Sequence, residues 1–251
     1  MLTLLRQEFF KLRKGKGWWL SLLAILICNS FYLFEIKRLK DISPTVMMEQ
    51  GGGGRWLIPF ILIIYSSIII TNEFTNNTAK LLLARQYTRT QIFISKILTL
   101  IGLYLGLVIF NWLVDLFFRL TFLRKSHFPS HLSATSFHYL IGFSLTTLLT
   151  STAVILISSL IKNSNSAAVS LGIVMIFASQ LIGQLLAMVI DKYNWLKFNP
   201  FNFFLVAGSY QWQTTTRAMT RLGINAMTIG ALIYSAIFLV LAGWIFNRRN
   251  V

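Results

Sequence analysis

The chain has 251 residues, of which 55% are hydrophobic and only 12% are charged. An average soluble domain carries about 25% charged residues, so this composition excludes an ordinary soluble globular protein, and its hydrophobicity excludes intrinsic disorder. At about 20 apolar residues per span, the composition predicts an all-α integral membrane protein with about six transmembrane helices. Lys and Arg total 23 against 7 Asp and Glu, and these basic residues lie between apolar runs, which favours anionic lipids over nucleic acid as partners.

Residues 1–16 have the pattern of an amphipathic helix. Apolar side chains recur at helical spacing, at Leu2, Leu5, Phe9 and Leu12. Basic side chains fill the other faces, so we predict an interfacial helix along the bilayer surface. The apolar run that follows contains the single cysteine, Cys28, and ends without a typical cleavage site. We therefore interpret it as an uncleaved first span rather than a signal peptide.

Residues 17–251 are predicted to form a single transmembrane domain. Its spans are expected at about 18–34, 56–72, 92–118, 137–161, 167–190 and 223–246. The glycine run Gly51–Gly54 precedes the second span, and we interpret it as a flexible hinge. Residues 195–206 are too apolar for a free loop and are interrupted by Pro200. They predict a re-entrant hairpin before the last span, sheltered by protein.

An even number of spans places both termini on the same side of the membrane. Basic residues are divided almost evenly between the two sides, so the positive-inside rule gives little guidance for the whole chain. The basic cluster ahead of the first span favours cytoplasmic termini, because that span usually dominates orientation.

Motifs for catalysis and metal binding are absent from the sequence. There is no G-x-x-x-x-G-K-[ST] run, so the chain lacks a P-loop for ATP. His127, His131 and His138 do not form an H-E-x-x-H motif, and interfacial placement explains them better than a metal site. We predict no catalytic residue, no metal and no cofactor on this chain.

Polar residues inside spans are candidates for function. Asp115 and Arg119, four residues apart near one end of the third span, are predicted to form an ion pair. Four carboxamides could line a substrate path or simply make interhelical hydrogen bonds: Asn29, Asn111, Gln180 and Gln184. Gly102 and Gly106 have the small-x-x-x-small spacing that allows helices to pack closely.

The polar segment between the second and third spans is the most informative part of the sequence. It resembles the permease subunits of type-2 ABC transporters, in which a Glu ends the second span, a short Leu-rich helix and a basic turn follow, and a Lys enters the third span. The residues at matching places are Glu73, Thr78, Leu81, Leu82, Thr88, Arg89 and Lys96. The chain departs from the pattern where Asn77 replaces a Gly, and where Gln86 or Tyr87 stands in place of a Pro.

The resemblance covers nearly the whole chain and is strongest to the small permeases of lantibiotic immunity and peptide-antibiotic export. It implies a bacterial plasma membrane protein with cytoplasmic termini, paired with a second permease chain and with a cytoplasmic ATPase dimer that binds ATP and Mg. It implies export of an amphipathic or antimicrobial peptide, or of a lipid-like substrate. The residues implied in ATPase coupling are Glu73, Thr78, Lys80, Leu82, Arg85, Arg89 and Lys96. Two alternatives remain at this point, a membrane immunity or scaffold protein without a motor, and a secondary transporter, which would need membrane-embedded carboxylates.

Overall fold

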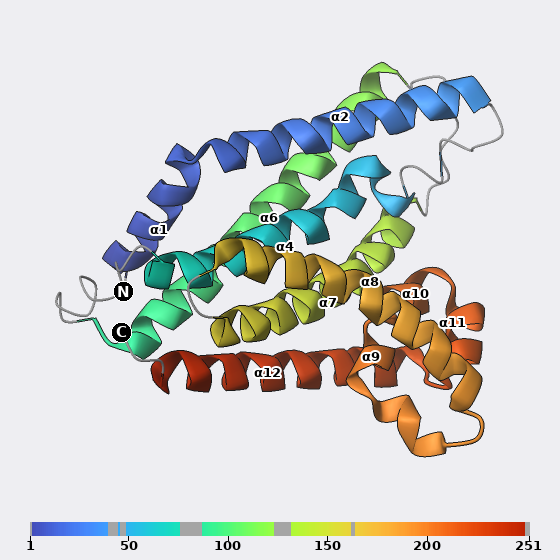
Figure 1. Cartoon of the computed structure of the whole chain (residues 1–251). Helices are drawn as coiled ribbons and strands as arrows, with labels where there is room; N and C mark the ends of the chain where they lie inside the picture. Colours follow the sequence, from blue (N-terminus) through green and yellow to red (C-terminus); the bar gives the residue numbers. More distant parts are fainter. Residues whose placement is uncertain are drawn as a thin grey trace. The chain divides into compact units, whose positions relative to one another are not determined.

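A computed structural model of the chain describes residues 2–39, 45, 49–75, 87–122, 132–161 and 164–248, and every regular element in these ranges is a helix (Figure 1). Six of the described helices are long and apolar enough to cross a membrane. In chain order these helices are α2 (Lys16–Leu39), α4 (Gly52–Thr75), α6 (Arg89–Thr121), α7 (Leu132–Leu160), α8 (Asn165–Val189) and α12 (Ile224–Arg248). The prediction of an all-α protein with six membrane-spanning helices is confirmed.

The start of α4 differs from its prediction in both position and structure. Prediction placed the start of this span at Trp56, whereas α4 begins at Gly52, so three of the four glycines form its first turn. The interpretation of Gly51–Gly54 as a flexible hinge is therefore wrong. The reason lies in packing, because these glycines are buried or half-buried against other helices.

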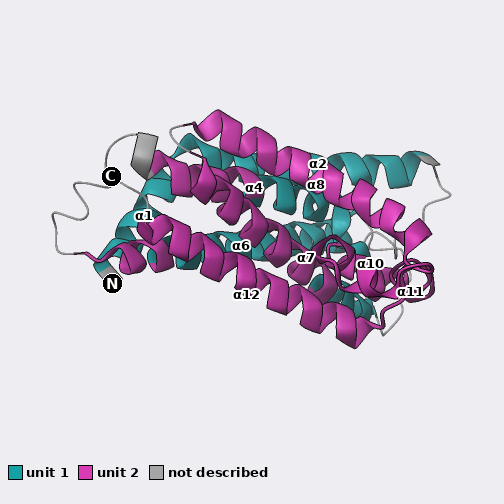
Figure 2. Ribbon diagram, turned by 60° about the horizontal axis from the view of Figure 1, so that its bottom comes forward, with its two compact units in different colours: residues 1–62, 95–140 teal, residues 63–94, 141–251 magenta. Residues whose placement is uncertain are grey.

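The chain divides into two compact units, which are described separately (Figure 2). Unit 1 comprises Met1–Leu62 and Ser95–Leu140, and unit 2 comprises Ile63–Ile94 and Ile141–Val251. The long helices α4, α6 and α7 pass from one unit into the other, so each contributes one part to unit 1 and one to unit 2.

Unit 1 holds the N-terminal helix α1 (Leu2–Lys14), which contacts α2. Leu4 and Glu8 are its buried side chains, and the placement of α1 along a bilayer surface stays a prediction. The Phe9 ring lies over Gly102 of α6, where a methyl group would approach Phe9 Cε1 to 2.9 Å. A methyl group on Gly106 would lie 3.2 Å from the Trp18 ring. The small-x-x-x-small spacing thus accommodates aromatic side chains of the same chain.

Unit 2 contains a chain of short helices between α8 and α12. They are η1 (Asn194–Phe198), α9 (Pro200–Phe203), α10 (Val206–Gln211) and α11 (Gln213–Thr220). Pro200 occupies the first turn of α9, where its missing N–H costs nothing, and the Asn199 side chain caps that helix by accepting from the Phe201 N–H at 3.0 Å.

The core of unit 2 explains why this segment is so apolar. Phe203, Phe204 and Val206 are buried with Met227 and Ala231 of α12. The segment is thus folded against a span, as expected for backbone sheltered by protein. Its descent into the bilayer as a re-entrant hairpin stays a prediction.

Candidate functional site

A buried polar cluster in unit 1 joins three membrane-spanning helices. Asn29 of α2 donates from Nδ2 to Asn111 Oδ1 of α6 at 3.0 Å, and it accepts from the Gly54 N–H of α4 at 2.8 Å. Asn111 Nδ2 donates to the Gly51 carbonyl at 2.9 Å and to Asp115 Oδ2 at 3.0 Å. Two of the four predicted pathway carboxamides are therefore brought together, as interhelical hydrogen-bonding groups.

The glycine run lets the backbone of α4 approach these carboxamides. A methyl group on Gly54 would lie 2.6 Å from Asn29 Nδ2, and one on Gly52 would lie 2.6 Å from Asp115 Oδ1. Gly51 and Gly52 also have φ angles of +75° and +65°, which a side chain would strain. Glycine is thus needed here both for close approach and for backbone conformation.

Two opposite charges complete the cluster. Asp115 and Arg55 are 6% and 8% exposed, and the Arg55 guanidinium acts electrostatically on the Asp115 carboxylate. Among the described residues, Arg55 Nη1 and Asp115 Oδ1 have no hydrogen-bond partner. The predicted pairing of Asp115 with Arg119 stays a prediction, whereas the partners that the structure gives Asp115 are Asn111 and Arg55.

A cleft of about 260 Å³ lies next to this cluster and within unit 1. Arg55 and Asn111 line it from α4 and α6, and Ser133 and Ser136 line it from the first turn of α7. The remaining lining residues are aliphatic or aromatic, so most of the lining is apolar.

A second charged group in unit 1 links α1 to α6. Lys96 is only 1% exposed, and its Nζ lies 3.8 Å from Glu8 Oε2, while Lys11 Nζ lies 2.9 Å from Glu8 Oε1. Burying Lys96 beside an acidic group offsets the cost of removing its charge from water. Lys96 therefore lies inside unit 1 rather than on its surface.

In unit 2, the first turn of α6 is attached to the end of α12. Arg89 Nη1 donates to the Asn247 carbonyl at 2.8 Å. Of the other predicted coupling residues, Glu73 lies in the last turn of α4, and only its backbone is described. The rest lie outside the described residues: Thr78, Lys80, Leu82 and Arg85.

Gln180 and Gln184 are placed away from the carboxamides of unit 1. Both lie in α8 within unit 2, and both are exposed. Phe177, Leu181 and Leu185 around them are also exposed, at 58–62%. The two glutamines thus form a polar pair on an otherwise apolar helix face.

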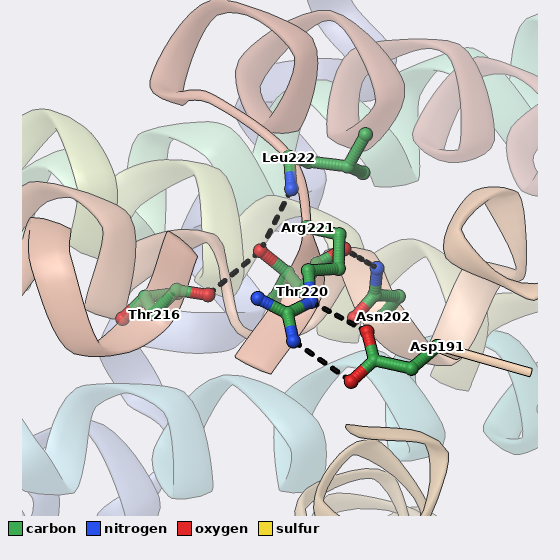
Figure 3. A network of polar contacts seen from close by, with 6 residues as sticks. All are labelled: Asp191, Asn202, Thr216, Thr220, Arg221 and Leu222. Carbon is green, nitrogen blue, oxygen red and sulfur yellow. Dashed lines mark hydrogen bonds and ion pairs between the residues drawn. The ribbon is translucent and has the colours of Figure 1, made fainter. Parts of the chain in front are cut away.

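A group of hydrogen bonds in unit 2 joins residues of the segment between α8 and α12 (Figure 3). Arg221 donates from Nε and Nη2 to the two carboxylate oxygens of Asp191, both at 2.8 Å. These hydrogen bonds hold the pKa of Asp191 below its usual value and raise the pKa of Arg221. Asn202 donates to the Thr220 carbonyl at 3.2 Å, and Thr220 Oγ1 accepts from the Leu222 N–H at 3.4 Å.

Sequence reasoning did not find Arg55, the close-approach glycines or Glu8. The available signal for Arg55 was its position directly after the glycine run and before an apolar span, because a charge inside a membrane usually has a partner. Within the described ranges, no three His, Cys, Asp or Glu side chains are grouped as a metal would require. Of the histidines, His138 lies in α7, and His127 and His131 fall outside those ranges.

Comparison with known proteins identifies the family. A family model described as "ABC-2 family transporter protein" matches residues 4–179. The Bacillus subtilis (strain 168) protein named "Uncharacterized membrane protein YdbK" is 27% identical over 249 residues, which are 96% of this chain and 99% of that protein. The protein named "Uncharacterized protein YhcI" of the same strain is 29% identical over 208 residues, 75% of this chain and 63% of that protein.

The family match covers well over half of the chain and agrees with its six candidate spans. Proteins of this family are membrane subunits of ABC transporters and generally work with an ATPase partner. This chain belongs to the ABC-2 family of transporter proteins.

Proposed function

We propose that this chain is the permease subunit of an ATP-driven exporter in a bacterial plasma membrane. A separate cytoplasmic ATPase dimer binds ATP and Mg and drives it, and both termini lie in the cytoplasm. The observation that carries the proposal is the family match over residues 4–179, which spans α2, α4 and α6 with the connection between α4 and α6.

In this proposal, residues 73–89 form the coupling segment that docks on the ATPase. The contacts at the start of α6 support such a role. Lys96 binds Glu8 of α1 within unit 1, and Arg89 binds the end of α12 within unit 2. A displacement of the coupling segment would therefore move α6 together with α1 and α12, as near-rigid bodies.

A second permease chain, identical or homologous, completes the pathway. The exposed face of α8 supports this proposal. In lipid, the amides of Gln180 and Gln184 would lack hydrogen-bond partners, and that cost favours covering them with another helix. Cysteines at Leu181 should cross-link between two chains in membranes, whereas cysteines at Ile237, exposed on α12, should not.

We propose an amphipathic or antimicrobial peptide, or a lipid-like molecule, as the substrate. With cytoplasmic termini, the outward segments have an excess of basic residues. A positive rim repels cations within a screening length of about 8 Å at physiological salt, so we expect a weakly charged or anionic substrate. Replacing Lys37, Arg38 and Lys40 by Gln tests this expectation. Unchanged export of both anionic and cationic peptides, at low and at high salt, would show that these basic residues have no role in substrate selection.

The coupling assignment is tested by ATPase measurements on the assembled complex. Glu73→Ala, or Arg85→Glu with Arg89→Glu, should leave the chain inserted while abolishing substrate stimulation of ATP hydrolysis. Arg217→Glu is the matched control, because this exposed basic residue lies in α11 within the connection between α8 and α12. Wild-type stimulation in the coupling variants would refute the assignment.

The orientation is tested by thiol labelling of intact cells in a Cys28→Ala background. Cysteines at Thr78 and Asn163 should be protected from an impermeant reagent, and cysteines at Ser43 and Ser130 should react. The reverse pattern would place the termini outside.

The two alternatives make different predictions. A secondary transporter would couple transport to a proton or sodium gradient through a membrane carboxylate, and the buried Asp115 is the candidate among the described residues. Export that persists without a gradient but requires ATP would exclude it. A motor-independent immunity or scaffold protein would protect cells with the ATPase deleted.

A further inference from the structure

We propose that the cleft in unit 1 is a binding site for the phosphodiester headgroup of a membrane phospholipid. The proposal rests on embedding of unit 1 in the bilayer and not on ATP-driven transport. It starts from Arg55, which lines the cleft, is 8% exposed, and has at Nη1 no hydrogen-bond partner among the described residues. A buried charged donor without an acceptor is costly, so an occupant that supplies an oxygen atom is favoured.

The first turn of α7 supplies the second half of the site. Ser133 and Ser136 line the cleft, and α7 runs for 29 residues from Leu132. The start of a helix carries partial positive charge and backbone N–H groups without intrahelical partners, which together favour an anion. Arg55 of α4 and two serines at the start of α7 thus line one cleft from two separate helices.

The carboxylate of Asp115 does not prevent an anion from binding. Asp115 does not line the cleft, and Asn111, which does, donates to its Oδ2 at 3.0 Å. One of the two carboxylate oxygens of Asp115 is thus occupied by the Asn111 amide. Asp115 acts on the Arg55 guanidinium electrostatically, and Nη1 has no hydrogen-bond partner among the described residues.

The walls and size of the cleft favour a lipid over a peptide carboxylate. Trp112 and Phe137 line the cleft and are 59% and 64% exposed, as expected of side chains that face acyl chains. A volume of about 260 Å³ is below the 300–1,000 Å³ typical of sites that enclose a drug-sized ligand. The cleft can hold a headgroup while the acyl chains stay in the bilayer, where phospholipid is always abundant.

The location of the cleft selects one leaflet. Arg55 lies in the first turn of α4 and Ser133 in the first turn of α7. Both helices start on the side of the membrane opposite to the termini, because each follows an odd number of spans. With cytoplasmic termini, the bound lipid belongs to the outer leaflet.

Native mass spectrometry of the purified full chain tests the proposal, with phosphatidylglycerol and diacylglycerol of identical acyl chains as probes. Wild-type protein should retain phosphatidylglycerol in preference to diacylglycerol. Arg55→Gln should weaken phosphatidylglycerol binding roughly tenfold, because a hydrogen bond to a charged group is lost. Val108→Trp, which fills the cleft from α6 and leaves Arg55 intact, should weaken it as well. Arg217→Gln, an exposed arginine of α11, should not.

Each opposite result overturns the proposal. Equal retention of both lipids would mean that no headgroup is recognised. Unchanged binding in Val108→Trp, with the variant eluting as a folded species, would place the lipid elsewhere. Displacement of the lipid by inorganic phosphate, dependent on Arg55, would reassign the site to a free anion. Displacement by an acylated peptide with a free carboxylate but not by its amide would reassign it to peptide.

Discussion

Removing Asn111 should destabilise unit 1 more than removing any other single carboxamide. Its side chain makes three hydrogen bonds, to Asn29, the Gly51 carbonyl and Asp115. Hydrogen bonds between helices in membrane proteins average about 0.6 kcal/mol each, and the same value for the Asn111–Asp115 bond within α6 gives about 1.8 kcal/mol for the three. Asn29 makes two of the bonds in this cluster, so its removal should cost about 1.2 kcal/mol on the same scale.

A double-mutant cycle isolates the contact between the two carboxamides. Asn29→Ala, Asn111→Ala and the double variant are compared by the free energy of unfolding in mixed micelles. Because the two side chains share one hydrogen bond of 3.0 Å, the double variant should lose about 0.6 kcal/mol less than the sum of the single variants. Measured on the same scale, Asn111→Ala should lose about one and a half times as much as Asn29→Ala.

The matched control is Thr99→Ala. Thr99 is also fully buried in α6, but the hydrogen bond described for it runs within the helix, to the Ser95 carbonyl at 2.8 Å. It should combine additively with Asn29→Ala, since the two side chains share no contact. If the losses of unfolding free energy in Asn29→Ala and Asn111→Ala add to within the experimental error, the hydrogen bond between these two side chains is refuted.

Two further tests address the ion pairs of Glu8 with Lys96 and of Asp191 with Arg221. Glu8→Ala should destabilise the protein by about 3 kcal/mol, because Lys96 would remain buried without this acidic partner. Lys11→Ala removes an exposed partner of the same carboxylate and should cost under about 1 kcal/mol. Equal losses of unfolding free energy in the two variants, by thermal or micelle unfolding, would contradict the burial of Lys96. Hydrogen bonds from Arg221 hold the pKa of Asp191 below its ordinary value. The difference in unfolding free energy between wild type and Asp191→Asn should therefore be constant above about pH 5. It should vanish as the pH falls through the pKa of Asp191 in the folded protein. Because the pair is exposed, that difference should be small, and a difference that grows with acid would reverse the sign of the linkage.

The helices of this fold could be predicted because their signal is local. Runs of about 20 apolar residues bounded by Lys, Arg and Trp identify spans directly, and the observed bounds differ from prediction by a few residues. The first turn of α4 had no such local signal. Four consecutive glycines have no preferred structure by propensity, so only the carboxamides packed against them explain why Gly52 begins a helix.

The contacts of the site could not be predicted, since they join residues far apart in the chain. Asn29 and Asn111 are 82 positions apart, and each is isolated within its own span by sequence pattern. The spacing of four residues links Asp115 equally to Asn111 and to Arg119, and only the tertiary structure shows the hydrogen bond to Asn111. Lys96 was assigned to ATPase coupling from its match to a family pattern, and no local pattern connects it with its acidic partner Glu8 of α1.

ATP-driven transport by this chain is tested most directly by reconstituting the purified chain with the ATPase that co-purifies with it. We expect a soluble P-loop ATPase to co-purify from native membranes and its ATP hydrolysis to rise on assembly with the chain, and we expect Glu73→Ala to keep assembly while losing this rise. A chain that purifies alone from those membranes and still protects cells lacking any such ATPase would contradict ATP-driven transport.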